Sequence, residues 1–253
     1  MSFLLALKFL TIIPLPWRRE ASPQQLGGSV AYFPAVGVII GLILAGLNWL
    51  LTWVLPAEVV NVLLVVLLVV LTGALHLDGF VDTCDGIAGH KSPEERLRVM
   101  RDSRAGGFGI IGVCCLILVK FLALNSLPEG IKMASLILMP TLSRWAMVYS
   151  VFAYPYARPS GLGKVFKEET SFKRFILATL TALVAAAVLG QLYGFIIMLA
   201  IWVITLAMAA YLKRKFAGLT GDTYGAINEV AEVSVLILTL LLAQSQLVLP
   251  SWG

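Results

Sequence analysis

Three aspartates, Asp78, Asp82 and Asp85, stand at positions i, i+4 and i+7 of one short segment of the chain. On a helix this spacing places the three carboxylates on one face, where their mutual repulsion is unfavourable unless a cation lies among them. Mg²⁺ commonly joins one or two carboxylates to the phosphates of a substrate. The spacing therefore predicts a Mg²⁺ site that handles a phosphate ester. A solvated acidic helix face is the alternative interpretation.

A basic segment rich in glycine follows the acidic one. Ser92-Pro93-Glu94-Glu95 has the pattern of a helix capping box, so a short basic helix is expected to begin there. After that helix, Asp102 stands between Arg101 and Arg104, and three glycines follow within a few residues. Because arginine forms paired hydrogen bonds with phosphate, we expect phosphate contacts from both arginines. A bias of basic residues toward one side of a membrane is the alternative explanation for the arginines, but not for the glycines.

A second acidic group enters the last apolar run of the sequence. Asp222 and Glu229 precede that run, and Glu232 lies inside it. Ionisable residues within membrane spans are rare and usually functional. Arg144, which lies in another apolar run, is expected to pair with Glu232 or with a phosphate. Lys120 is expected to extend outward to the membrane boundary and to have no role at the site.

The composition indicates that these residues belong to a membrane protein. The chain of 253 residues is 59% hydrophobic and 13% charged, with a mean hydropathy of +0.92, whereas soluble chains average about 25% charged residues. These values exclude an ordinary soluble enzyme. The net charge of +5 is attributed to orientation in the membrane, so no nucleic-acid partner is expected. The three cysteines have neither zinc-site nor disulfide spacing.

Seven apolar runs are candidates for membrane-spanning helices. They cover residues 30–55, 59–75, 107–124, 131–152, 175–193, 195–212 and 230–249. Residues 3–13 are too short to span, and we expect them to be interfacial or re-entrant. The predicted fold is an all-α polytopic membrane helix bundle of about seven transmembrane helices, forming a single integral-membrane catalytic domain over residues 1–253. Gly37 and Gly41 have the spacing that lets another helix approach closely.

The distribution of positive charge predicts the orientation of the bundle. Most of the 19 Lys and Arg residues fall in the segments on one side, and Lys132 alone falls on the other. Cytoplasmic loops collect positive charge. The amino terminus and the loops that carry the site are therefore expected in the cytoplasm, and the carboxyl terminus outside. Trp49, Trp53 and Trp252 are expected to anchor the outer boundary.

Together these segments resemble the cobalamin synthase family, the adenosylcobinamide-GDP ribazoletransferases. The resemblance is carried by His76-Leu-Asp-Gly-x-x-Asp-Thr-x-Asp-Gly86, Met100-Arg-Asp-Ser-Arg-x-Gly106 and Gly218-Leu-Thr-Gly-Asp-x-x-Gly225. Phe9-Leu-Thr-x-x-Pro14 and Tyr156-Ala-Arg-Pro-x-Gly-Leu-Gly163 extend it along nearly the whole chain. Cys84 stands where the family often has alanine, so we expect it to have a packing role.

The resemblance implies a Mg²⁺-dependent phosphotransferase of the cell inner membrane that completes the nucleotide loop of cobalamin. A ribose hydroxyl of α-ribazole or its 5′-phosphate attacks the cobinamide-bearing phosphorus of adenosylcobinamide-GDP. GMP leaves, and adenosylcobalamin or its 5′-phosphate results. The implied partners are these small molecules and the lipid bilayer, and homo-oligomerisation is left open.

The resemblance and the residue pattern together give a set of expected site residues. The expected metal ligands are Asp78, Asp82, Asp85, Asp102 and Glu232. The expected catalytic residues are Asp82, Asp85, Arg101 and Arg104, with Asp82 or Asp85 deprotonating the attacking hydroxyl. The residues expected to bind the cofactor or substrate are Gly106, Arg144, Asp222 and Glu229. Four further residues are interpreted equally as substrate contacts or as boundary residues, namely Thr11, Arg158, Lys164 and Tyr224.

Two other functions are weighed against this one. The opening of the signature of CDP-alcohol phosphotransferases is matched by Asp82-x-x-Asp85-Gly86, but His90 stands where that signature needs arginine, and its later glycine and aspartates are absent. A transporter would suit the intramembrane Glu232 and Arg144. The polar residues gather on one face, however, and the hydropathy shows no inverted halves.

Overall fold

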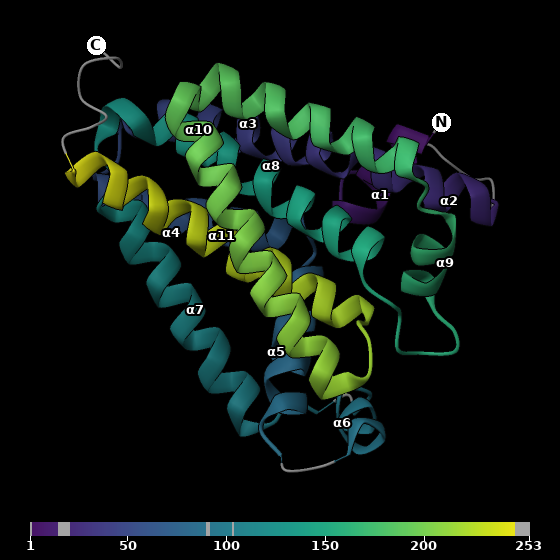
Figure 1. Cartoon of the computed structure of the whole chain (residues 1–253). Helices are drawn as coiled ribbons and strands as arrows, with labels where there is room; N and C mark the ends of the chain where they lie inside the picture. Colours follow the sequence, from purple (N-terminus) through teal and green to yellow (C-terminus); the bar gives the residue numbers. More distant parts are fainter. Residues whose placement is uncertain (1, 15–20, 90–91, 103, 246–253) are drawn as a thin grey trace.

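The computed structural model describes residues 2–14, 21–89, 92–102 and 104–245, and every regular element in these residues is a helix (Figure 1). The α-helices are α1 (Ser2–Leu10), α2 (Pro23–Ser29), α3 (Phe33–Leu51), α4 (Ala57–Leu71), α5 (Leu75–Ile87), α6 (Pro93–Val99), α7 (Gly107–Asn125), α8 (Glu129–Ala153), α9 (Leu162–Glu169), α10 (Phe172–Phe216) and α11 (Gly221–Gln244), and a short 3₁₀ helix, η1 (Val30–Tyr32), precedes α3. The predicted all-α class is confirmed. His90, Trp252 and the end of the predicted span 230–249 lie outside the described residues.

Among the described residues, five helical stretches are long and apolar enough to cross a membrane, or six if a bent pair counts as one span. The expected number of seven is not confirmed. The difference lies partly in α10, which counts as one stretch although it consists of two helical arms, in the region where two spans were expected. Its backbone leaves the helical region at Gln191 (φ 46°, ψ −131°), and Figure 1 shows its two arms meeting at a sharp bend. The break between the two spans, predicted at Gly194, therefore lies three residues earlier in the chain, at Gln191.

The bent pair is α4 and α5, whose axes meet at 88°. Gly73 and Ala74 adopt left-handed backbone angles (φ 58° and 56°), a region in which glycine is unstrained. The span predicted over residues 59–75 therefore ends at Leu71, and the aspartate segment begins a separate helix. This turn directs α5 across the bundle, where it packs against α7 and α11.

Helix α8 forms the centre of the bundle and packs against α3, α10 and α11. A β-carbon on Gly37 would collide with the backbone of Pro140, and one on Gly41 with the backbone of Ile137. The close helix approach predicted for these two glycines is confirmed, and its partner is α8. The approach places the backbones of α3 and α8 in direct contact.

Helix α6 holds the carboxyl end of α5. It begins with the predicted capping box, in which Ser92 and Glu95 exchange hydrogen bonds of 3.3 and 3.1 Å. Arg96 is buried and donates to the carbonyl groups of Gly86 (2.8 Å) and Ile87 (2.6 Å). These bonds satisfy carbonyls that the end of α5 would otherwise leave unpaired. The helix that carries the three aspartates is thus fixed at its carboxyl end.

Candidate functional site

The three aspartates of α5 lie on one helix, as predicted, and the amino end of α11 meets them. Asp78 is exposed, whereas Asp82 and Asp85 are half-buried. Gly79 touches the backbone of α11, because a β-carbon there would lie 2.7 Å from the carbonyl oxygen of Asp222 and 2.8 Å from its Cα. Asp82 interacts electrostatically with both Asp222 and Asp78. The structure therefore brings together acidic residues that are about 140 positions apart in the sequence.

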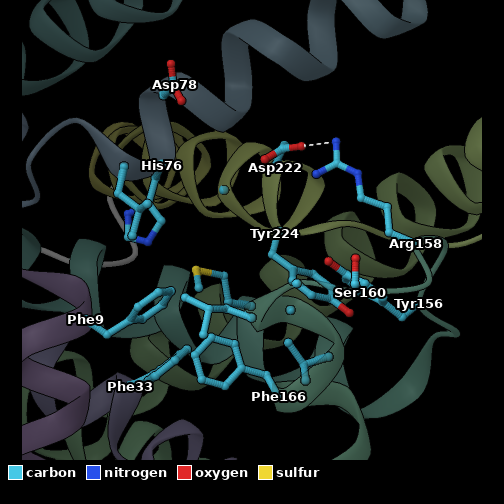
Figure 2. A pocket seen from close by; sticks show the side chains of 18 residues that line it. Phe9, Phe33, His76, Asp78, Tyr156, Arg158, Ser160, Phe166, Asp222 and Tyr224 are labelled. Carbon is cyan, nitrogen blue, oxygen red and sulfur yellow. Dashed lines mark hydrogen bonds and ion pairs between the residues drawn. The ribbon is translucent and has the colours of Figure 1, made fainter. Parts of the chain in front are cut away.

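Arg158 supplies the positive charge nearest to this acidic group. Its Nη2 lies 2.6 Å from Oδ2 of Asp222 (Figure 2), and its Nε is buried without a partner among the described residues. The loop that carries Arg158 is fixed to the start of α11 by two backbone hydrogen bonds of 2.8 Å between the 155–157 stretch and Leu219. Arg158 is thus positioned beside the carboxylates with a donor to spare for an anion.

Asp85 differs from the other two aspartates of α5 because both of its carboxylate oxygens already have partners. They accept hydrogen bonds from the backbone N–H groups of Gly106 (2.7 Å) and Gly109 (2.8 Å) at the start of α7. A β-carbon at either glycine would lie 2.5 Å from a carboxylate oxygen of Asp85. This close approach to Asp85 accounts for the glycines at positions 106 and 109 without a phosphate contact. The predicted roles of Asp85 as a metal ligand and catalytic residue, and of Gly106 in binding the cofactor or substrate, stay predictions.

Arg101, Asp102 and Arg104 are exposed on the loop after α6. Asp102 and Arg104 form an ion pair of 2.9 Å, which lowers the pKa of the Asp102 carboxyl to about 2. Arg101 lies within electrostatic range of Tyr156. Burial raises the pKa of the Tyr156 hydroxyl, so Tyr156 stays protonated at neutral pH. No three His, Cys, Asp or Glu side chains in the described residues are grouped closely enough to hold a metal ion by themselves.

The carboxylates deeper in α11 belong to a separate, fully buried charge cluster. Lys120 donates from Nζ to Oε2 of Glu229 (2.7 Å) and to Oε2 of Glu232 (2.6 Å). Arg144 forms an ion pair with Oε1 of Glu232, which confirms that expected pair, and Asn228 donates to the same oxygen. The prediction that Lys120 extends outward was wrong, because its helix turns this face toward α11. The structure gives no support to metal binding by Glu232, whose two oxygens are occupied by these partners.

A cavity of about 280 Å³ opens beside the acidic group (Figure 2). Its aromatic lining consists of Phe9, Phe33, Tyr156, Phe166 and Tyr224. Its polar lining includes His76, Asp78, Arg158, Ser160 and Asp222. Figure 2 shows the three phenylalanines on one side of the space and Asp78, Asp222 and Arg158 on the opposite side. The cavity therefore has an apolar aromatic floor and a charged rim, which is a common form of small-molecule site.

Several of these lining residues were not singled out from the sequence. Arg158 and Tyr224, for which the sequence left two interpretations, line the cavity, whereas Thr11 and Lys164 do not. Thr11 donates to the carbonyl of Leu7, and Lys164 to that of Pro159. The phenylalanines were missed because single aromatic residues in apolar runs carry no signal of a site. The only available signal was that two of the quoted motifs begin with Phe9 and Tyr156.

A family model and individual relatives assign the chain to the same family over most of its length. The family model described as cobalamin-5-phosphate synthase matches residues 2–240. A protein from Roseiflexus sp. (strain RS-1), named adenosylcobinamide-GDP ribazoletransferase, is 38% identical over 231 residues, which are 91% of this chain and 86% of the relative. A protein of the same name from Geotalea daltonii is 36% identical, with 93% of this chain and 95% of the relative covered. No solved structure matches the chain significantly.

Proposed function

The chain belongs to the cobalamin-5-phosphate synthase family of cobalamin biosynthesis, and we propose that it transfers a phosphate-linked cobinamide from adenosylcobinamide-GDP to α-ribazole or α-ribazole 5′-phosphate. In this reaction a ribose hydroxyl oxygen forms a bond to the cobinamide-bearing phosphorus. The bond between that phosphorus and the oxygen of the GMP portion breaks. The hydroxyl proton is taken up by a carboxylate, and GMP leaves. The products are GMP and adenosylcobalamin or its 5′-phosphate.

One observation carries this proposal, namely that Asp78 of α5 and Asp222 of α11 lie together at the rim of an aromatic cavity, with Arg158 beside Asp222 and with Asp82 interacting electrostatically with both carboxylates. Phosphoryl transfer depends on positioning and on charge stabilisation around the phosphorus. Carboxylates and an arginine in one place supply both a base and an anion partner. Such a constellation fits a diphosphate ester better than it fits a neutral substrate.

Among the carboxylates, we assign the role of base to Asp82. Asp85 was the other candidate, but its two oxygens accept the backbone hydrogen bonds of Gly106 and Gly109. Asp82 is half-buried. Unlike Asp85, its carboxylate makes no hydrogen bond or ion pair with the described residues. It is therefore free to accept the proton of a hydroxyl group.

Mg²⁺ is part of the proposal because the donor set suits it. Asp78 and Asp222 offer carboxylate oxygens, the ligands that hard divalent cations prefer, and this leaves Asp82 free to act as the base. Mg²⁺ usually needs only one or two carboxylates when substrate phosphates complete its coordination, which agrees with the absence of a three-residue metal group in the described part of the chain. When bound, the ion would neutralise the diphosphate and stabilise the departing GMP.

The arginines complete the proposed site. Arg158 holds Asp222 at 2.6 Å and offers its remaining donors to a phosphate oxygen. Arg101 and Arg158 both interact electrostatically with Tyr156, and Arg101 is the proposed partner of the leaving group. Arg104 and Asp102 stay candidates on the exposed loop. We further propose that this end of the bundle faces the cytoplasm, because the loops around it carry most of the positive charge.

The direct test is release of GMP by the purified full-length protein in lipid nanodiscs. Adenosylcobinamide-GDP, α-ribazole 5′-phosphate and Mg²⁺ are supplied together, and each is then left out in turn. The proposal predicts GMP release and formation of the joined corrinoid only when all three are present. A folded protein that releases no GMP with any divalent cation would refute the proposed transfer.

A further inference from the structure

The aromatic floor of the cavity is built from elements that are distant in the sequence. Phe9 of α1 lies 5.8 Å from Phe33 of α3 and 4.9 Å from Phe166 of α9, measured between ring centroids. Tyr156 and Tyr224 lie 6.3 Å apart on the side toward the charged rim. Aromatic rings at such separations favour stacking and edge contacts with a further flat ring. The shape and chemistry of the floor therefore suit a planar, largely apolar group.

Besides Nε of Arg158 at the rim, two buried polar atoms of the lining have no hydrogen-bond partner among the described residues, the Tyr224 hydroxyl and the His76 Nε2. The two side chains are only 3% and 2% exposed. The His76 Nδ1 faces Nη2 of Arg144 at 3.5 Å, and because a guanidinium can only donate, we assign the imidazole proton to Nε2. Both unpartnered groups can therefore donate. Buried donors without partners are unfavourable and rare in proteins, so they indicate a ligand that brings an acceptor.

The three ring systems of the proposed substrates differ in how they fit this cavity. A corrin ring is far too large for about 280 Å³, a volume near the lower end of the range for small-molecule sites. Guanine has acceptors in O6 and N7, but it also carries an N–H and an amino group that need acceptors, and the aromatic floor supplies none, since the unpartnered groups there are donors. The benzimidazole base of a ribazole is flat and apolar, and its one free ring nitrogen is an acceptor. This base fits the floor and its donors best.

We propose that the cavity is the subsite for the benzimidazole base of the acceptor nucleoside, with the Tyr224 hydroxyl donating to the ring nitrogen that is not bonded to ribose. This inference rests on the proposed function and names the position of one substrate within it. With the base on the phenylalanine floor, the attached ribose lies at the rim beside Asp78 and Asp222. The attacking hydroxyl then lies on the side of the cavity where Asp82, the proposed base, interacts with these two carboxylates.

The test compares two ligands that differ in one atom. One is α-ribazole, and the other is its analogue with an indole base, in which carbon replaces the acceptor nitrogen. Binding of each to the full-length protein in nanodiscs is measured by calorimetry without adenosylcobinamide-GDP, so that no turnover is needed. Because one neutral hydrogen bond is at stake, the wild-type protein should bind α-ribazole about 2- to 12-fold more tightly than the indole analogue.

Tyr224→Phe removes only the unpartnered hydroxyl and should bind the two ligands equally, by weakening the binding of α-ribazole. Tyr211→Phe, which removes a hydroxyl from an exposed ring of α10 outside the cavity lining, should keep the wild-type preference. GMP should not displace α-ribazole. Retention of the full preference by Tyr224→Phe, displacement of α-ribazole by GMP, or failure of the folded wild-type protein to bind α-ribazole would each overturn the subsite.

The two proposals can fail separately. A wild-type protein that binds α-ribazole with the predicted preference but releases no GMP in the complete reaction contradicts the proposed function and leaves the base subsite standing. A wild-type protein that releases GMP while Tyr224→Phe keeps its preference for α-ribazole overturns the subsite alone.

Discussion

The ammonium group of Lys120 lies 2.6 Å from the carboxylate of Glu232 in the interior of the bundle, so that α7 and α11 are joined by a buried ion pair. Arg144 of α8 binds the same carboxylate, and Glu229 completes a cluster of two acidic and two basic side chains. Each charge is matched by an opposite charge, which makes the cluster tolerable in an apolar environment. The cluster therefore fixes the relative positions of three helices behind the candidate site.

Lys120→Met should destabilise the protein strongly, because it leaves Glu229 without its cation and Glu232 with only Arg144. Removal of one partner of a buried pair typically costs about 3–5 kcal/mol. The free energy of unfolding, measured by denaturant titration in mixed micelles, should fall by that order, whereas Lys213→Met at an exposed position should change it little. The double variant with Glu229→Gln should recover part of the loss. Equal stability of Lys120→Met and the wild type would contradict the cluster.

The contact between α3 and α8 predicts opposite effects for two glycines of the same helix. Gly37→Ala places a methyl group against the backbone of Pro140, and overpacking of this kind typically costs about 1–3 kcal/mol. Gly46→Ala meets nothing within 4 Å, so it should leave stability unchanged or raise it, because alanine favours a helix over glycine. Thermal unfolding of the two variants in the same nanodiscs provides the comparison. Similar midpoints for both would show that the two helices are not in close contact at Gly37.

These contacts show how far the sequence specifies the fold. The aspartate helix, the capping box at Ser92 and the close approach at Gly37 were predicted, because each depends on local spacing. The 88° turn after Leu71 was missed. Residues 68–75 stay largely apolar through the turn, and hydropathy records composition but not direction.

The sequence predicted the acidic residues of the candidate site, but it predicted neither the position of Lys120 nor the aromatic lining of the cavity. Asp222 was expected among the site residues, and the structure brings it to the α5 aspartates. The inward position of Lys120 was missed, since a helix that is apolar all around gives no periodic signal for the face that points inward. The aromatic floor of the cavity could not be predicted, because it depends on how α1, α3 and α9 pack against each other.

Asp85→Asn should reduce stability, because an amide can no longer accept from both Gly106 and Gly109. Loss of one hydrogen bond to a charged acceptor is worth about 1.5–3 kcal/mol. Hydrogen exchange of residues 106–110 should become faster, which reports on the start of α7 directly. Unchanged stability and exchange combined with loss of turnover would instead assign Asp85 to the chemistry.

The proposed orientation predicts which side of the membrane each end of the bundle faces. In a variant without its native cysteines, Glu94→Cys lies on exposed α6 near the candidate site, and Gly130→Cys lies at the exposed start of α8. A membrane-impermeant thiol reagent added outside intact spheroplasts should label Gly130→Cys and not Glu94→Cys. The reverse labelling pattern would invert the topology and place the candidate site outside the cell.

The most direct measurement of the central claim is the rate of Mg²⁺-dependent GMP release by Asp82→Asn beside the wild type, with folding of both verified by thermal unfolding. If Asp82 accepts the proton of the attacking hydroxyl, its loss should slow release by about 10²- to 10⁴-fold, the usual contribution of general base catalysis. Asp82 is half-buried, and its carboxylate makes no hydrogen bond or ion pair with the described residues, so stability should be kept. A folded Asp82→Asn protein that releases GMP at nearly the wild-type rate would contradict the account.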